Sequence, residues 1–225
     1  MKTLPLTTPE VRSILAGRKT RITLPVEPQP VWSEAIPNYL GTGATRAAGW
    51  VIGDDGGFFH DKSTPEQIML HFDNGEREPP FRVGDVVGVK EEFNVHDLFY
   101  DDYAGGWEAG YPLKDVPAEK HRNCCVSYRA DDDMGEWRAA ADMPNWAIRL
   151  HLRVTSVSVY RVCRISEAEA IAEGFAGIRH VPEMGCWLTP PSCDFRREWQ
   201  SKHPAYPFDS AWGCGIGFEV QQTKG

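Results

Sequence analysis

A basic stretch beside Gly17 carries side chains suited to binding an anionic ligand. The range 12–21 contains four basic residues and no acid: Arg12, Arg18, Lys19 and Arg21. The hydroxyl of Thr20 lies within this range, and that of Thr23 lies two residues beyond it. Basic residues are also favoured at the C-terminal end of a helix, where they complement its dipole. The stretch therefore predicts either a phosphate-binding pocket or a solvated helix end.

Aromatic and charged residues of later segments are suited to completing a nucleotide site. Tyr128 and Trp146 offer rings on which a base can stack. Arg129 and Arg149 alternate with apolar neighbours, so each can face a cleft and can equally face water. Glu91 can bind a ligand amine or pair with Arg149. Because tryptophan usually packs, Trp146 fits a buried position as well as a stacking one.

The charge of the whole chain limits the nucleic-acid binding that this protein can perform. Its 225 residues include 24 Lys and Arg against 32 Asp and Glu, a formal net charge of −8. General nucleic-acid binders are basic, because phosphate neutralisation supplies most of their affinity. The composition therefore excludes extensive coating of DNA or RNA and confines nucleotide binding to a local pocket.

The cysteines and the N-terminus predict a cytoplasmic protein without a metal or another cofactor. The sequence shows no apolar run of membrane-spanning length and no signal peptide, so no membrane partner is expected. Six cysteines in such a chain indicate reduced thiols. The nearest approach to a metal pattern fits no standard zinc spacing: His180, Cys186, Cys193 and His203.

Three short helices are predicted from capping and periodicity. Thr8 is the expected N-cap of the first helix, which Gly17 ends. Ser166 and Glu169 form a capping box at the start of the second. The third runs from Ser192 to about Lys202.

The other regular structure is predicted to be strand, over the ranges 20–24, 85–92, 124–130, 147–162 and 214–221. The apolar residues of the range 147–162 change from even-numbered to odd-numbered positions near Thr155–Ser156, which predicts a bulge or bend. The range 94–120 has loop character, and the ranges 31–80 and 94–123 are predicted to be insertions, with short strands at 49–52 and 68–72. Strands with few helices and no βαβ repeat predict one barrel-like α+β domain over 1–225.

Six segments, in this order, resemble the ASCH domain family, whose fold is a small PUA-like β-barrel. The segments are ILAGRKTRITLPVEPQP (14–30), FRVGDVVGVKEEF (81–93), YRADDD…W (128–137), MPNWAIRLHLRV (143–154), ISEAEAIAEGF (165–175) and FRREW (195–199). Their order and linking lengths look like the larger, phage-associated branch of that family. The resemblance spans most of the chain and implies a cleft that holds a nucleotide, often in RNA.

The resemblance also implies a catalytic set. Similar small bacterial members hydrolyse the acetyl amide of acetylcytidine with a lysine, a threonine and a glutamate. The lysine matches Lys19 and the glutamate matches Glu173, whereas the position of the threonine is occupied by Ile22 and Thr23 follows one residue later. If the chain is extended from Lys19 to Thr23, the Thr23 hydroxyl can still reach the lysine; if the chain turns, that hydroxyl is lost from the site.

Two functions follow from these residues. The first is a nucleotide- or single-stranded-RNA-binding module with a cleft between the GRKT segment (17–20) and the predicted helix 166–173. The second is an amidohydrolase that removes an acyl group from a modified pyrimidine nucleoside. Ile22 at the expected hydroxyl position favours binding over hydrolysis.

Overall fold

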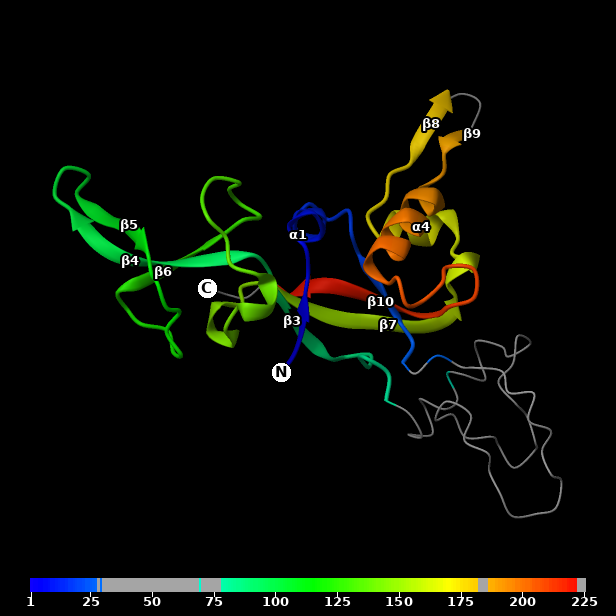
Figure 1. Ribbon diagram of the computed structural model, residues 1–225, viewed down its shortest axis with the longest axis horizontal. Coiled ribbons are helices and arrows are strands. Elements are labelled where there is room, and N and C mark those ends of the chain that lie inside the picture. Colours follow the sequence, from blue (N-terminus) through cyan, green and yellow to red (C-terminus); the bar gives the residue numbers. More distant parts are fainter. Residues whose placement is uncertain (28, 30–68, 70–77, 182–185, 222–225) are drawn as a thin grey trace, which may run out of the picture. The chain divides into compact units, whose positions relative to one another are not determined.

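The computed structural model describes residues 1–27, 29, 69, 78–181 and 186–221 (Figure 1). Strands predominate over helices, which confirms the predicted α+β class. The helices are α1 (Thr8–Leu15), α3 (Glu167–Ala172) and α4 (Pro191–Lys202), and the 3-10 turns are η1 (Ala140–Asp142), η2 (Asn145–Ala147) and η3 (Val162–Arg164). The strands are β1 (Lys2–Pro5), β2 (Arg21–Pro25), β3 (Val86–Lys90), β4 (Phe93–Asp101), β5 (Gly106–Pro112), β6 (Cys124–Tyr128), β7 (His151–Arg161), β8 (Ile178–Val181), β9 (Cys186–Thr189) and β10 (Trp212–Gln221).

The chain divides into two compact units, each made of separate stretches of sequence. Unit 1 comprises Met1–Arg18, Gly84–Arg153 and Glu219–Gly225. Unit 2 comprises Lys19–Val83 and Val154–Phe218. The strands are hydrogen-bonded in the orders β1-β3-β7-β10-β2, β5-β4-β6 and β8-β9. The single domain expected from the sequence stays a prediction.

Unit 1 contains the three-stranded antiparallel sheet β5-β4-β6 and the parallel pair of β1 with β3. Side chains on one face of a strand alternate with those on the other, so Phe93 and Val95 of β4 lie on the same face. Both are fully buried, and they pack against the loop that precedes β7. The core of this unit consists of Phe93, Val95, Cys124, Met143, Ala147 and Ile148.

Unit 2 pairs β2 with β10 in antiparallel register, from Arg21 opposite Gly217 to Pro25 opposite Gly213. Phe195 and Trp199 lie one helical turn apart on α4 and are buried against Phe208. The core of this unit consists of Val162, Ile165, Ala170, Phe195, Trp199, Phe208 and Ala211.

The helix starts show how local sequence sets these elements. Ser166 and Glu169 form the predicted capping box, with Ser166 N–H donating to Glu169 Oε2 at 2.9 Å. The N-cap of α1 is Thr7 and not Thr8, because Thr7 rather than Thr8 forms a capping box with Glu10. Helix α4 begins at Pro191, one residue before the predicted start, as proline suits the first helical turn.

The sequence does not predict β1, β8 and β9, and the strand predictions differ from the structure in two further ranges. The range 147–162 is a strand only from His151, because Asn145–Ala147 forms a 3-10 turn. The range 94–120, for which the sequence predicts a loop, contains most of β4 and all of β5. A register shift between His96 and Leu98 interrupts the alternation of the two faces of β4, and many side chains of this hairpin are exposed. The sequence therefore shows no regular alternation of apolar and polar residues here.

Strand β7 is continuous through the parity change at Thr155–Ser156. Leu152 and Val154 are buried before this point and Val159 after it, so the buried positions pass from even to odd numbers. The described strands do not form a closed barrel, and the PUA-like barrel stays a prediction. The strands expected at 49–52 and 68–72, and nearly all of 31–80, lie outside the described residues.

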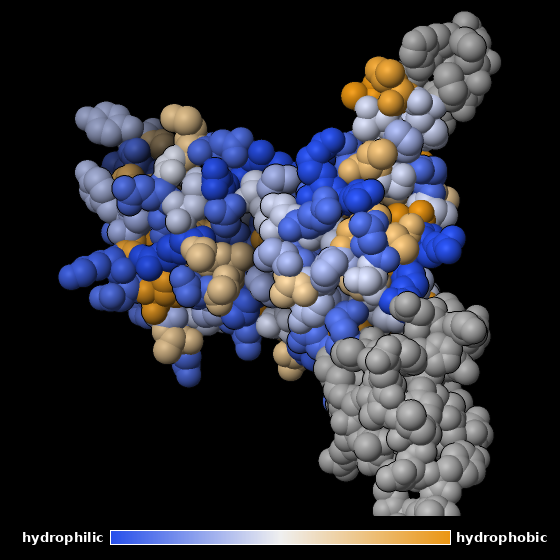
Figure 2. Space-filling model, turned by 45° about the vertical axis from the view of Figure 1, so that its right-hand side comes forward, coloured by the Kyte–Doolittle hydropathy of each residue, from blue (hydrophilic) through white to orange (hydrophobic). Residues whose placement is uncertain are grey.

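The described surface mixes hydrophobic and hydrophilic residues. The face drawn in Figure 2 carries small, separate groups of hydrophobic residues among hydrophilic ones. Within the described ranges, no helix combines the length and hydropathy that crossing a bilayer requires.

Candidate functional site

Lys19, Thr23 and Glu173 converge in unit 2 and are called the Lys-Thr-Glu cluster below. Lys19 Nζ donates to Glu173 Oε2 at 3.0 Å and to the Glu173 main-chain oxygen at 2.9 Å. Thr23 Oγ1 donates to the other carboxylate oxygen, Glu173 Oε1. The three residues are 5%, 6% and 5% exposed, respectively. One buried carboxylate is therefore shared by an ammonium group and a hydroxyl.

Two elements of unit 2 hold the cluster. Lys19 lies just before β2, and Glu173 is the residue at which α3 ends. The main-chain N–H of Thr20 donates to the carbonyl of Ala172 at 2.8 Å, which ties the approach to β2 directly to the last turn of α3. The side chain of Glu173 is thereby fixed beside Lys19.

The direction of each side chain along β2 decides which hydroxyl joins the cluster. Adjacent residues of a strand point to opposite faces, and β2 is extended from Arg21. Ile22 is buried, and its register partner is Ile216. Thr23 lies on the other face, where its hydroxyl meets Glu173. The Thr23 hydroxyl, one residue after the position that the resemblance implies, therefore lies at the carboxylate.

Alternate glycines of β10 make room for the side chains of β2. A Cβ atom at Gly213 would lie 2.8 Å from the Cγ2 atom of Thr23, and one at Gly215 would collide with the guanidinium of Arg21. The alternation of Gly213, Gly215 and Gly217 is visible in the sequence and is the signal that could have placed β10 against this face.

Tyr160 of β7 was not singled out from the sequence, yet it contacts the cluster. Its hydroxyl lies 2.6 Å from Thr23 Oγ1. Because Thr23 donates to Glu173, Tyr160 is the donor in this second hydrogen bond. Arg21 packs over the ring with its Cζ 5.1 Å from the ring centroid, and it pairs with Glu169 at 3.1 Å. Contacts with Arg21 and with Thr23 therefore fix both the ring and the hydroxyl of Tyr160.

Burial controls the protonation of this site. It raises the pKa of Glu173 above the usual range of a glutamate, against the lowering effect of Lys19 and Thr23. Burial, together with the nearby Glu173 carboxylate, raises the pKa of Tyr160 to about 12. A carboxylate with a raised pKa is a stronger base than an exposed one, and Glu173 already accepts a hydrogen bond from the Thr23 hydroxyl. The arrangement can activate a threonine nucleophile.

Three predicted residues of unit 1, Glu91, Tyr128 and Arg149, contact one another in a separate group. Arg149 binds the buried Glu91 through Nε at 2.9 Å and through a terminal nitrogen at 3.1 Å. It also pairs with Asp131 and lies over Tyr128, its Cζ 3.9 Å from the ring centroid. Burial raises the pKa of Glu91, which Arg149 opposes. The donors of Arg149 are thus engaged by carboxylates, as the alternative pairing with Glu91 anticipated.

The remaining predicted residues are dispersed. Arg129 pairs with Glu92 at 2.9 Å. Trp146 is half-buried against the core of unit 1, and its indole N–H donates to the carbonyl of Pro117 at 3.0 Å. Arg18 and Thr20 are exposed. Their roles in nucleotide binding stay predictions.

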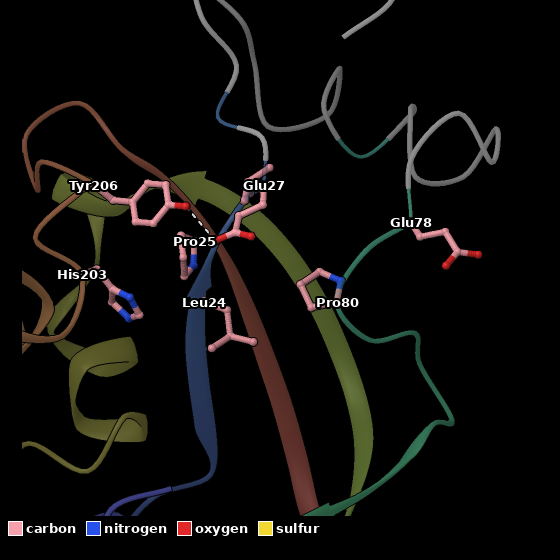
Figure 3. A pocket seen from close by; sticks show the side chains of 8 residues that line it. Leu24, Pro25, Glu27, Glu78, Pro80, His203 and Tyr206 are labelled. Carbon is pink, nitrogen blue, oxygen red and sulfur yellow. Dashed lines mark hydrogen bonds between the residues drawn. The ribbon is translucent and has the colours of Figure 1, made fainter. Parts of the chain in front are cut away.

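A pocket of about 480 Å³ lies at the end of β2, beyond the cluster (Figure 3). Leu24, Pro80 and His203 line it, and Tyr206 donates to Glu27 at its edge at 2.7 Å. Lys19, Thr23 and Glu173 are not among the residues that line it, so the pocket is distinct from the Lys-Thr-Glu cluster. The segments expected to flank a cleft, 17–23 and 166–173, are instead joined by direct contacts, the Thr20 to Ala172 hydrogen bond among them.

No group of three or more potential metal ligands occurs in the part of the chain that the structure describes. Comparison of the chain with family models, with curated proteins and with solved structures finds no match.

Proposed function

We propose that this protein is an amidohydrolase that removes an acyl group from a modified pyrimidine nucleoside, of the acetylcytidine type, within a PUA-like fold. The observation that supports this proposal is the meeting of Lys19, Thr23 and Glu173 around one buried carboxylate. The resemblance to the ASCH family assigns Lys19 and Glu173 to catalysis, and Thr23 directly follows the position that it assigns to the threonine. The offset at Ile22 had favoured simple binding, and the position of the Thr23 hydroxyl removes that objection.

In the proposed reaction, Thr23 Oγ1 attacks the acyl carbonyl while its proton passes to Glu173. The C–N bond then breaks, the pyrimidine amine leaves with a proton, and an acyl-threonine ester remains for water to hydrolyse. General acid–base catalysis of this kind contributes about 10²- to 10⁴-fold to a rate. Glu173 is both base and proton carrier in this scheme, which suits its raised pKa.

Lys19 and Tyr160 prepare the nucleophile and its base. The two hydrogen bonds from Lys19 to the side chain and main chain of Glu173 orient the carboxylate. The hydrogen bond from Tyr160 fixes the Thr23 oxygen from its other side. Arg21 Nε is buried without a hydrogen-bond partner among the described residues, so it has a donor available for an oxygen of the substrate.

A nucleotide- or RNA-binding module without turnover is the second candidate. The observation that favours it is the near-complete burial of the cluster, because groups that satisfy one another need no substrate. In this case the exposed Arg18 and Thr20 would contact the ligand. Binding of a nucleoside without hydrolysis separates this candidate from the first.

The proposal is tested by incubating the full chain with acetylcytidine and with cytidine. Product chromatography is expected to show cytidine and acetate released in equal amounts from acetylcytidine, and a thermal-shift assay to show binding of the nucleoside. Binding without release would identify a binding module. If the chain neither binds acetylcytidine nor releases cytidine from it, both candidates are wrong.

Replacing Tyr160 with phenylalanine is expected to lower kcat about three- to tenfold with little change in KM. The substitution removes one hydrogen bond to the Thr23 oxygen, and a net hydrogen bond contributes about 0.5–1.5 kcal/mol. Because the pKa of Tyr160 is about 12, the shape of the pH–rate profile between pH 5 and 9 should not change. Tyr206→Phe, which removes a phenol hydroxyl at the separate pocket, is the matched control and should retain wild-type kinetics. A profile that loses a limb in Tyr160→Phe would assign proton transfer to Tyr160 instead.

A further inference from the structure

The hairpin of β4 and β5 in unit 1, shown in green in Figure 1, exposes an unusual set of aromatic side chains. Trp107 is 66% exposed and Tyr111 is 87% exposed. Tyr100 and Trp107 are register partners on one face, and their rings meet edge to face at 5.7 Å between centroids. The exposed aromatic residues of this hairpin are Phe99, Tyr100, Tyr103, Trp107 and Tyr111. Tyr100 and Trp107 thus form an exposed aromatic pair, and exposed apolar surface commonly marks an interaction site.

Hydrogen bonds fix the turn between β4 and β5, which carries the exposed ring of Tyr103. Asp101 Oδ1 accepts from the N–H of Tyr103 at 2.8 Å and from the N–H of Ala104 at 3.2 Å. Gly105 has a φ of 68°, a conformation that favours glycine, and it closes the turn by donating to the Asp101 carbonyl at 2.8 Å. Tyr103 therefore projects fully into solvent from an ordered turn.

The charges of the hairpin all have one sign. The range 93–113 contains four acids, Asp97, Asp101, Asp102 and Glu108, and no lysine or arginine. Such a surface repels phosphate. It attracts cations, which aromatic faces also bind through their quadrupole.

Strand β5 also has an unpaired edge in the described structure. The strand order is β5-β4-β6, so β5 has a neighbour on one side alone. Proteins block such edges with lysine, proline or very short strands. In β5 the sole proline is the last residue, Pro112, and lysine is absent. The main-chain groups of this edge are available to an added strand.

We propose that the β4–β5 hairpin is a docking surface for an extended segment of a partner protein that carries lysine or arginine. The segment adds a strand to the edge of β5, and its cationic side chains lie against the exposed rings and the carboxylates. The negative charge of the hairpin favours a cationic protein segment over the other possible partners. A nucleic-acid strand would meet the four carboxylates, and a second copy of this chain would bring the same acidic hairpin and a net charge of −8.

The test uses the full chain and a synthetic acetylated peptide of alternating arginine and threonine residues, with binding measured by calorimetry. Each exposed cation–π contact contributes about 0.5–1 kcal/mol, so Trp107→Ala is expected to weaken binding about two- to fivefold. Glu108→Lys should weaken it further, because it reverses a charge on the edge strand. The control Leu188→Ala removes an exposed apolar side chain of unit 2 and should bind as the wild type does.

The contribution of strand pairing is tested by methylating alternate peptide nitrogens in two complementary sets. One of the two methylated peptides is expected to lose binding, since alternate N–H groups of a strand face the same neighbour. The proposal is overturned if both methylated peptides bind equally, or if Trp107→Ala and Glu108→Lys bind the unmethylated peptide like wild type. Binding of oligo-dT that these variants abolish would assign the surface to nucleic acid, and concentration-dependent dimerisation lost in them would assign it to a second copy.

Discussion

Replacing Lys19 with methionine is expected to lower the free energy of unfolding by about 3–5 kcal/mol. Lys19 and Glu173 form an ion pair in which both side chains are nearly inaccessible to solvent, and removing one partner of a buried pair leaves a charge without compensation. Urea denaturation at pH 7 measures the change.

The pH dependence and two further variants make this result specific. Burial already raises the pKa of Glu173 in the folded protein, and loss of Lys19 raises it further. A carboxyl group whose pKa is higher in the folded state destabilises the fold as pH rises through that value, so the penalty should shrink when the pH is lowered toward 5. The double variant Lys19→Met and Glu173→Leu should recover most of the loss. The control Arg18→Met, at an exposed neighbour, should change the free energy by less than about 0.5 kcal/mol. A loss in Lys19→Met no larger than that in Arg18→Met would contradict the buried pair.

Replacing Thr23 with valine is expected to reduce the turnover of acetylcytidine by a factor on the order of a thousand or more. Valine keeps the shape of the side chain but has no hydroxyl to attack the acyl carbon, and the covalent route is lost. Initial rates of cytidine release, measured at saturating substrate, give the effect on kcat. Nucleoside binding should persist, since the hydroxyl acts in the reaction step.

The second-site variant Ile22→Thr distinguishes the two hydroxyl positions. In the background of Thr23→Val, a threonine at position 22 should fail to restore turnover, because residue 22 points away from Glu173. Recovery of activity in the double variant would place the nucleophile at position 22 and contradict the geometry proposed for Thr23.

Part of the site could be predicted from the sequence, and the missing part has a physical cause. Lys19 and Glu173 follow from a resemblance between local segments, and the capping box at Ser166 marks the helix that carries Glu173. Tyr160 could not be found this way, because its contact with Thr23 depends on the arrangement of β7, β10 and β2 across a sheet. Such an arrangement is set by long-range pairing and not by the residues beside Tyr160.

Two predictions failed or stayed open for similar reasons. The loop predicted over 94–120 is wrong where β4 and β5 form, since a register shift at His96 and exposed aromatic residues hide the alternation of a strand. The nucleotide contacts assigned to Arg149 and Glu91 rested on exposure, which sequence does not give. In the structure these two side chains bind each other.

The way the chain is shared between the two units has a practical consequence for anyone who dissects this protein. The sequence passes from one unit to the other after residues 18, 83, 153 and 218, so neither unit corresponds to a continuous fragment. A truncation after residue 83 or 153 removes strands from both units. A deletion that keeps the segment around Lys19 alone would separate β2 from its partner β10, which lies almost two hundred residues later. Contacts so distant in sequence slow folding, and they also mean that limited proteolysis at a single point should leave the cleaved halves associated.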